Sequence, residues 1–150
     1  MTTTKSFRLI ILLSFFFIKS FTQNNPTGIY IIGKGLKEEN SMLKGNHGEI
    51  RVKKLSPTKV AIALYVLDEY NIGDFVDTLI LNKNKAIYSK NSVDSSCKIY
   101  FNFLGSQLLI KQTSKIYPYT CGFGRNVDIS GLYRKVSPKV PVITNMVKEP

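Results

Sequence analysis

From Gly28 to Val136 the sequence is a series of short runs, rich in β-branched and aromatic residues, in which apolar and polar side chains alternate. Gly, Asn, Pro and Ser separate these runs, and no stretch sustains an apolar period of 3.6 residues. Alternation with a period of two turns one face of each strand to a core and the other to solvent. The chain is therefore predicted to be nearly all β.

Three pairs of runs are joined by short polar connections of the kind that close hairpins. They are Glu49–Leu55 with Lys59–Leu67, Phe75–Leu81 with Ala86–Ser89, and Cys97–Leu104 with Gln107–Thr113. The run Val60–Leu67 is apolar on both faces, so this strand is expected to be central or covered on its outer side. The acidic segment 68–74 is interpreted as a solvated connection between two strands.

Both ends of this region carry a Gly-x-Tyr strand, beginning at Gly28 and at Gly131. If the first and last strands pair, the sheet closes on itself and has no exposed edge. The expected fold is therefore an all-β, up-and-down antiparallel β-barrel of about eight strands. A two-sheet β-sandwich is the alternative.

The N-terminus has the pattern of a signal peptide. Lys5 and Arg8 precede the apolar run Leu9–Ile18, which is shorter than the roughly 20 residues needed to span a bilayer as a helix. Ser20 and Thr22 place small residues before a cut after residue 22. We therefore expect an exported protein, periplasmic or secreted, without a transmembrane segment after cleavage. Its expected parts are a signal peptide over 1–22, a β-barrel domain over 23–137 and an extended tail over 138–150.

Positive charge dominates the exported part. Without the signal peptide the chain keeps 18 basic and 10 acidic side chains, a net charge of +8. Export separates this charge from nucleic acid, so the expected partners are a small molecule, an anionic envelope component or another protein. The alternative is a solvated cationic surface without a specific partner.

Two cysteines in an exported chain of 150 residues predict one disulfide, between Cys97 and Cys121. It would close a loop of about 25 residues and contribute about 2–4 kcal/mol. A catalytic thiol is the alternative, but the one histidine, His47, is distant in sequence. With no nucleophile elbow, metal triad or convergent acid pair in the sequence, no enzymatic activity, metal or cofactor is expected. The spacing of Asp74, Asp94 and Asp128 favours surface placement over a catalytic acid pair.

The segment Tyr117–Val127 is the first candidate for a binding site. It contains Tyr119, Phe123 and Arg125, and glycines on both sides of Phe123 permit a tight backbone with positive φ. Rigid aromatic and basic loops on a β scaffold often carry binding residues. A stapled loop that plugs one end of the barrel explains the same residues.

Two further candidates lie outside this loop. Asp77 shares a period-two face with Phe75, Leu79 and Leu81, so it is buried and needs a partner if that face is the interior. If the opposite face is the interior, Asp77 lies in solvent. His47 is interpreted either as a turn residue or as a hydrogen-bond donor at the barrel mouth.

Two binding functions follow from this fold. A carrier of a small apolar or anionic ligand requires a cavity inside the barrel. Its walls would be Val60, Ile62, Leu64, Ile99, Phe101 and Phe103. An interaction or inhibitor module requires instead a filled barrel and a functional loop around Tyr117–Arg125.

Several segments together resemble a family of small exported Bacteroidetes proteins without an established activity. They are His47–Ile50, Gly73–Leu79, Ala86–Tyr88, Cys97–Phe103, Cys121–Gly124 and Gly131–Lys135. The resemblance covers most of residues 27–138 and implies export, paired cysteines and one β domain. In size, export and disulfide the chain is also similar to periplasmic barrels that inhibit lysozyme. It lacks their C-terminal inhibitory loop, and its net charge of +8 would repel a cationic lysozyme.

Overall fold

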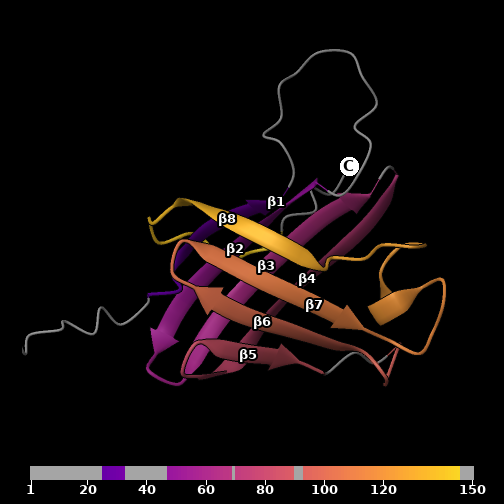
Figure 1. Cartoon of the computed structure of the whole chain (residues 1–150), viewed down its shortest axis with the longest axis horizontal. Helices are drawn as coiled ribbons and strands as arrows, with labels where there is room; N and C mark the ends of the chain where they lie inside the picture. Colours follow the sequence, from indigo (N-terminus) through magenta and orange to yellow (C-terminus); the bar gives the residue numbers. More distant parts are fainter. Residues whose placement is uncertain (1–24, 33–46, 69, 90–92, 146–150) are drawn as a thin grey trace, which may run out of the picture.

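The computed structural model describes residues 25–32, 47–68, 70–89 and 93–145, so the expected signal peptide lies outside the described residues. Within them the chain forms eight strands that close into one antiparallel barrel in chain order (Figure 1). The strands are β1 (Gly28–Ile32), β2 (His47–Ser56), β3 (Lys59–Asp68), β4 (Asn71–Asn82), β5 (Lys85–Tyr88), β6 (Lys98–Leu104), β7 (Gln107–Thr113) and β8 (Gly131–Ser137). The predicted up-and-down barrel is confirmed.

The three predicted hairpins are β2–β3, β4–β5 and β6–β7, each closed by a two-residue turn. The turns are Pro57-Thr58, Lys83-Asn84 and Gly105-Ser106. Lys83 has φ of 57° and Gly105 has φ of 72°. Positive φ values are characteristic of the turns whose twist matches that of the flanking strands.

Strand β4 begins earlier than the sequence predicted. It starts at Asn71, opposite Asp68 of β3, and Asp74 pairs with Tyr65. The interpretation of 71–74 as part of a solvated connection is therefore wrong. The Asn-Ile-Gly-Asp composition is poor for a strand, but pairing along the whole length of β3 overrides this local preference.

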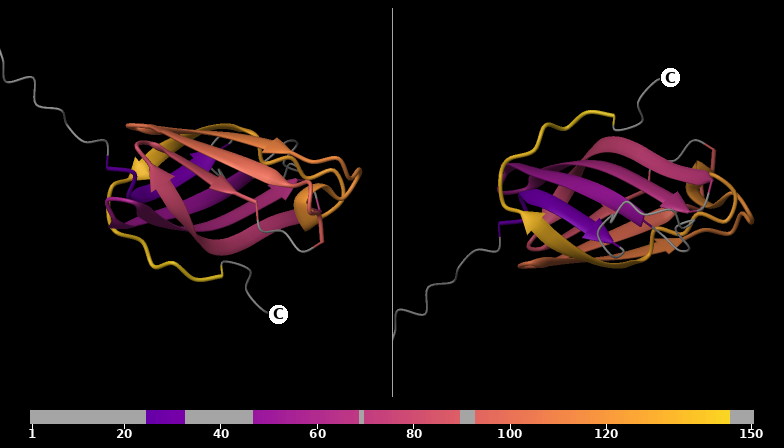
Figure 2. Two further views of the ribbon diagram at one scale, coloured as in Figure 1. Left: turned by 90° about the horizontal axis from the view of Figure 1, so that it is seen from below. Right: turned by 90° about the horizontal axis from the view of Figure 1, so that it is seen from above.

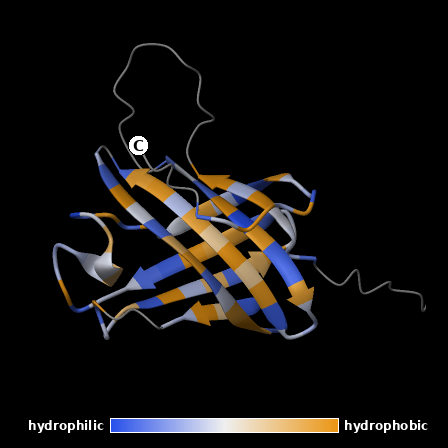
Figure 3. Ribbon diagram, turned by 180° about the vertical axis from the view of Figure 1, so that it is seen from behind, coloured by the Kyte–Doolittle hydropathy of each residue, from blue (hydrophilic) through white to orange (hydrophobic). Residues whose placement is uncertain are grey.

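The barrel interior is filled by one cluster of apolar side chains. Inward and outward residues alternate along the strands, and the colouring of Figure 3 shows this alternation. Tyr30, Tyr133 and all six residues expected to line a carrier cavity belong to this cluster and are at most 1% exposed. The cavity-lining candidates thus pack against one another as a core.

The first and last strands close the barrel, as their matching Gly-x-Tyr sequences suggested. Tyr30 of β1 pairs with Lys135 of β8, and Ile31 pairs with Arg134. Gly28 allows this approach, because a Cβ atom there would collide with the carbonyl oxygen of Ser137. Side-chain bulk is thus excluded at the point where the sheet closes.

The two ends of the barrel differ. At the hairpin end, each tight turn accepts a hydrogen bond from the next hairpin or strand: Leu81 N–H donates to Thr58, Phe103 N–H to Asn84 and Lys135 N–H to Ser106, at 2.8–2.9 Å. At the opposite end, which we call the loop end, β7 and β8 are joined by the longer segment 114–130. Among the described residues, the hairpin end has tight turns, whereas the loop end carries the long connection between β7 and β8.

The last described residues lie along the outer wall of the barrel. Residues 138–145 contain no helix or strand, and both views of Figure 2 place them outside the side formed by β2, β3 and β4. Pro141 is buried, as are Ala61 and Ala63 on the outer face of β3. Of the two alternatives expected for this strand, coverage of its outer face is thus the one that the structure supports, since no strand of a closed barrel is central.

The ladder between β4 and β5 is the shortest in the barrel. It joins two residue pairs, whereas β3 and β4 share ten. Aromatic rings pack beside this short ladder: Phe75 stacks on Tyr88 with centroids 4.7 Å apart and contacts Phe101 edge-on at 6.2 Å. Side-chain packing here supplements the few backbone hydrogen bonds.

Candidate functional site

The segment 114–130, which we call the β7–β8 loop, lies at the loop end and is drawn in orange on the right of Figure 1. The predicted disulfide between Cys97 and Cys121 is confirmed and ties this loop to the start of β6. Its backbone includes a cis peptide bond between Tyr117 and Pro118 and a short 3₁₀ turn over Thr120–Gly122. The loop is thus covalently fixed near its centre.

A buried carboxylate, Asp94, holds the loop beside the disulfide. Asp94 Oδ1 accepts hydrogen bonds from the backbone and hydroxyl of Ser96, and Oδ2 accepts from Ser114 Oγ and from Cys121 N–H. Hydrogen bonds from Ser114 and then Ser96 lower the pKa of Asp94 to about 2. The surface placement expected for this aspartate is wrong, because it satisfies donors from two separate segments.

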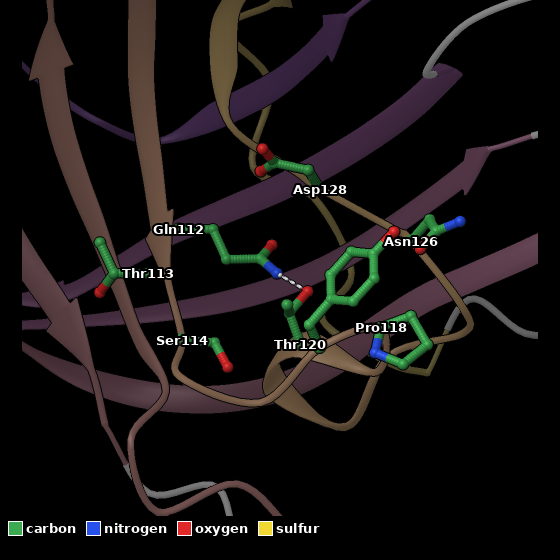
Figure 4. Close-up of a pocket in the computed structure, with 8 residues that line it drawn as sticks. Gln112, Thr113, Ser114, Pro118, Thr120, Asn126 and Asp128 are labelled. Carbon is green, nitrogen blue, oxygen red and sulfur yellow. Dashed lines mark hydrogen bonds between the residues drawn. The ribbon is translucent and has the colours of Figure 1, made fainter.

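Gln112 fastens the other side of the loop. From the end of β7 its Nε2 donates to Thr120 Oγ1 at 2.7 Å (Figure 4). The same nitrogen donates to the Val127 carbonyl, and Gln112 Oε1 accepts from Ile129 N–H. Neither the role of Gln112 nor that of Asp94 in holding the loop was predicted from the sequence. The available signals were a polar residue that continues the inward face of Leu108 and Ile110, and an Asp-x-Ser sequence typical of an Asx turn.

Two glycines bring the loop against β4. A Cβ atom on Gly73 would lie 2.9 Å from Val127 and 3.1 Å from Phe123, and one on Gly124 would lie 2.9 Å from Asn71. Gly124 N–H donates to the Ile72 carbonyl at 2.8 Å. Gly124 therefore serves close approach rather than the positive φ expected of it.

Positive φ occurs nearby at three other loop residues. They are Cys121, Gly122 and Asn126, with φ of 59°, 70° and 63°. Phe123, one of the predicted binding residues, is buried in the core cluster. Its burial makes it an anchor of the loop, and sequence alone did not distinguish it from its exposed aromatic neighbours.

The outer side of the loop presents large side chains to solvent. Tyr117 is 80% exposed and Tyr119 is 54% exposed, and Arg125 is also exposed. A groove of about 450 Å³ lies between this loop and the end of β7 (Figure 4). Its lining consists of Gln112, Thr113, Ser114, Tyr117, Pro118, Thr120, Asn126 and Asp128.

His47 and Asp77 lie apart from this groove lining. His47 is the first residue of β2 and pairs with Leu67, so its interpretation as a turn residue is wrong. Both of its ring nitrogens are buried and have no hydrogen-bond partner among the described residues. Of the predicted binding residues, Tyr119 and Arg125 belong to the loop beside the groove without lining it, and His47 belongs to neither the loop nor the lining.

Asp77 lies on the inward face of β4, between Phe75 and Leu79 and opposite Ile62. It is partly exposed, and its Oδ1 accepts a hydrogen bond from Thr78 N–H at 2.7 Å. The inward alternative for this residue is therefore the one the structure supports. Asp77 is four residues along β4 from Gly73, where the loop packs, and at about 3.3 Å per residue this places the two about 13 Å apart. Asp77 is therefore not part of the loop contact.

Three potential metal-ligating side chains converge beside the loop: Asp94, Cys97 and Cys121. Both sulfur atoms are joined in the disulfide, and a thiolate is the form of cysteine that binds metal. This cluster is therefore a structural anchor.

No helix among the described residues has both the length and the apolar character needed to cross a membrane. Comparisons with models of protein families, with curated proteins and with solved structures found no match to this chain.

Proposed function

We propose that this chain is an exported, non-enzymatic binding module that recognises its partner through the β7–β8 loop. The observation that carries the proposal is the contrast between the interior and the loop. The interior positions that a carrier would need are packed in one apolar core, whereas Tyr117, Tyr119 and Arg125 are exposed on an anchored frame. Aromatic and arginine side chains are the types most enriched at binding hot spots.

The frame supports this role because it fixes the loop before a partner arrives. The loop is attached at three places. The disulfide joins it to Cys97 beside β6, Asp94 holds it to the segment before β6, and Gln112 holds it to the end of β7. Ordering a mobile loop costs binding free energy, and a loop already fixed in its bound form avoids that cost. The presented side chains thus lose little further freedom on binding.

The redox state and charge of the chain fit an extracytoplasmic partner. Disulfides persist in oxidising compartments, and the net charge of +8 attracts anionic envelope surfaces at long range. We expect this charge to raise the rate at which the chain meets its partner, and not to select the partner, because the charge is spread over many side chains. Added salt should slow association more than it speeds dissociation.

Co-sedimentation with the insoluble envelope fraction of the source organism tests the proposal. The loop variant is Tyr117→Ala/Arg125→Ala, and its matched control is Tyr100→Ala/Arg134→Ala on the outer wall of β6 and β8. All four side chains are exposed, so both variants should unfold at the wild-type temperature. The loop variant is expected to lose at least about tenfold in affinity, and the wall variant to bind normally.

A fluorescent fatty-acid analogue supplies the second arm. The packed interior predicts no saturable binding of this probe. Saturable binding of the probe, or equal envelope binding by the loop variant and the wild type, would contradict the proposed function.

A further inference from the structure

The groove beside the β7–β8 loop has a mainly polar lining. It offers two side-chain amides, three hydroxyls, one carboxylate and the phenol of Tyr117, together with Pro118. None of the eight lining residues is a lysine or an arginine, and Pro118 is the one with a purely aliphatic side chain. A matching ligand must therefore carry many hydrogen-bonding groups and one apolar face, and it gains nothing from negative charge.

A sugar ring has this combination. Each hydroxyl both donates and accepts, which suits side-chain amides, hydroxyls and a carboxylate, and the C–H groups on one face of the ring pack against an aromatic side chain. A volume of about 450 Å³ lies within the roughly 300–1,000 Å³ of small-molecule sites. An apolar ligand would instead leave most of these polar groups unpaired.

The floor of the groove is fixed in place. The Gln112 amide is held by Thr120, Val127 and Ile129, and the Thr120 hydroxyl also donates to the Val127 carbonyl at 3.1 Å. These bonds set the direction of the remaining lone pairs, so a ligand does not have to order them. A site with fixed polar groups selects among similar polar ligands.

The rim residue Asn126 is held by its backbone. Its φ is 63°, and its N–H donates to the Pro118 carbonyl at 2.8 Å. Asp128 also lines the groove, and its Oδ1 accepts a hydrogen bond from Ser130 N–H at 2.8 Å. A carboxylate in the lining repels phosphates and uronates but forms charge-assisted hydrogen bonds with sugar hydroxyls.

We propose that this groove binds an uncharged saccharide, with Tyr117 as the stacking platform and Asn126 and Asp128 as hydrogen-bonding partners of its hydroxyls. This assignment rests on the proposed function, since it names the ligand class of the same loop. Positive charge elsewhere on the chain brings the protein to an anionic envelope, and the groove then selects a neutral sugar unit there.

The test is an NMR titration of the ¹⁵N-labelled full exported chain with short neutral oligosaccharides of glucose, mannose, galactose and N-acetylglucosamine. At least one is expected to shift the side-chain amide signals of Gln112 and Asn126 with a Kd below about 10 mM. Tyr117→Ala and Asn126→Gly should each weaken this binding at least about tenfold. Glycine suits the positive φ at 126, so the second variant removes the side chain without straining the backbone.

Tyr100→Ala is the matched control, because Tyr100 is an exposed tyrosine of β6 that does not line the groove. It should bind the oligosaccharide as the wild type does. Equal loss in Tyr117→Ala and Tyr100→Ala would overturn the assignment, since the groove would then not be the site.

Three other results would also overturn it. They are the absence of shifts with every neutral oligosaccharide, stronger shifts with uronate oligosaccharides or inorganic phosphate, and stronger shifts with a lysine-rich or arginine-rich peptide. If these occur while envelope binding still depends on the loop, the proposed function stands without the saccharide. If envelope binding does not depend on the loop, the proposed function itself fails.

Discussion

Tyr30 and Tyr133 occupy equivalent positions in the two strands that close the barrel. Each is fully buried, and each phenol donates to the carbonyl four residues earlier, that of Pro26 at 2.7 Å and that of Ile129 at 2.9 Å. Both strands thus fasten the chain segment that leads into them. The matching Gly-x-Tyr sequences thus form the same hydrogen bond in β1 and in β8, the two strands whose pairing closes the barrel.

Removing either hydroxyl should therefore destabilise the barrel. Tyr30→Phe and Tyr133→Phe each leave a buried carbonyl without its donor, at a cost of about 1–2 kcal/mol in the free energy of unfolding. Guanidinium denaturation measures this cost. The exposed Tyr117→Phe is the control and should not change the midpoint, and unchanged midpoints in both buried variants would contradict the paired role.

Substitution by alanine at Gly28 and at Gly131, the first residues of β1 and β8, should lower the free energy of unfolding by different amounts. A Cβ atom at Gly28 collides with backbone, the carbonyl oxygen of Ser137, whereas one at Gly131 collides with the flexible end of the Ile32 side chain. We expect Gly28→Ala to cost about 2–3 kcal/mol and Gly131→Ala distinctly less. Thermal unfolding of the two variants side by side decides this, and the reverse order would count against the geometry of β1 and β8.

Acid should loosen the β7–β8 loop through Asp94. Hydrogen bonds from Ser114 and Ser96 hold its pKa at about 2, below the value near 3.9 of an unfolded aspartate. Its contribution is therefore complete above about pH 5 and is lost as the pH falls from about 4 towards 2. Asp94→Asn should lower the melting temperature at pH 7 by several degrees and flatten this acid decline. A parallel decline in wild type and variant would show that the carboxylate does not anchor the loop.

Reduction should weaken the loop end selectively. The disulfide links residues 24 positions apart, and its loss should lower the free energy of unfolding by about 2–4 kcal/mol. Urea denaturation of the oxidised chain and of Cys97→Ser/Cys121→Ser compares the two states. Ellman titration of the denatured, oxidised chain should find no thiol, and two thiols per chain would refute the link.

Much of the fold was readable from the sequence because its determinants are local. Period-two alternation and short polar connections indicated the hairpins, and the count of two cysteines indicated the disulfide. The start of β4 was not readable, because residues 71–74 are strand only through their pairing with β3. A local pattern does not include the partner strand that decides such a segment.

The site was less predictable because its residues meet across long separations. Asp94 is fastened to Ser114 and Cys121, and Gln112 to Thr120 and Ile129, and none of these pairs follows from spacing. The sequence selected Tyr119, Phe123 and Arg125 by type. Only the packed structure separates the buried Phe123 from its exposed neighbours and places Tyr117 in the groove.

The two residue pairs between β4 and β5 set where the closed barrel opens most easily. Local opening requires breaking few hydrogen bonds there, while the ten pairs of β3 and β4 remain intact. Amide hydrogen exchange should accordingly be faster in β5 than in β3. The free energy of opening measured for the β5 amides should lie well below the free energy of global unfolding. Opening at this ladder would turn the barrel into a curled sheet with β4 and β5 as its edge strands, and free edge strands offer main-chain pairing to another molecule.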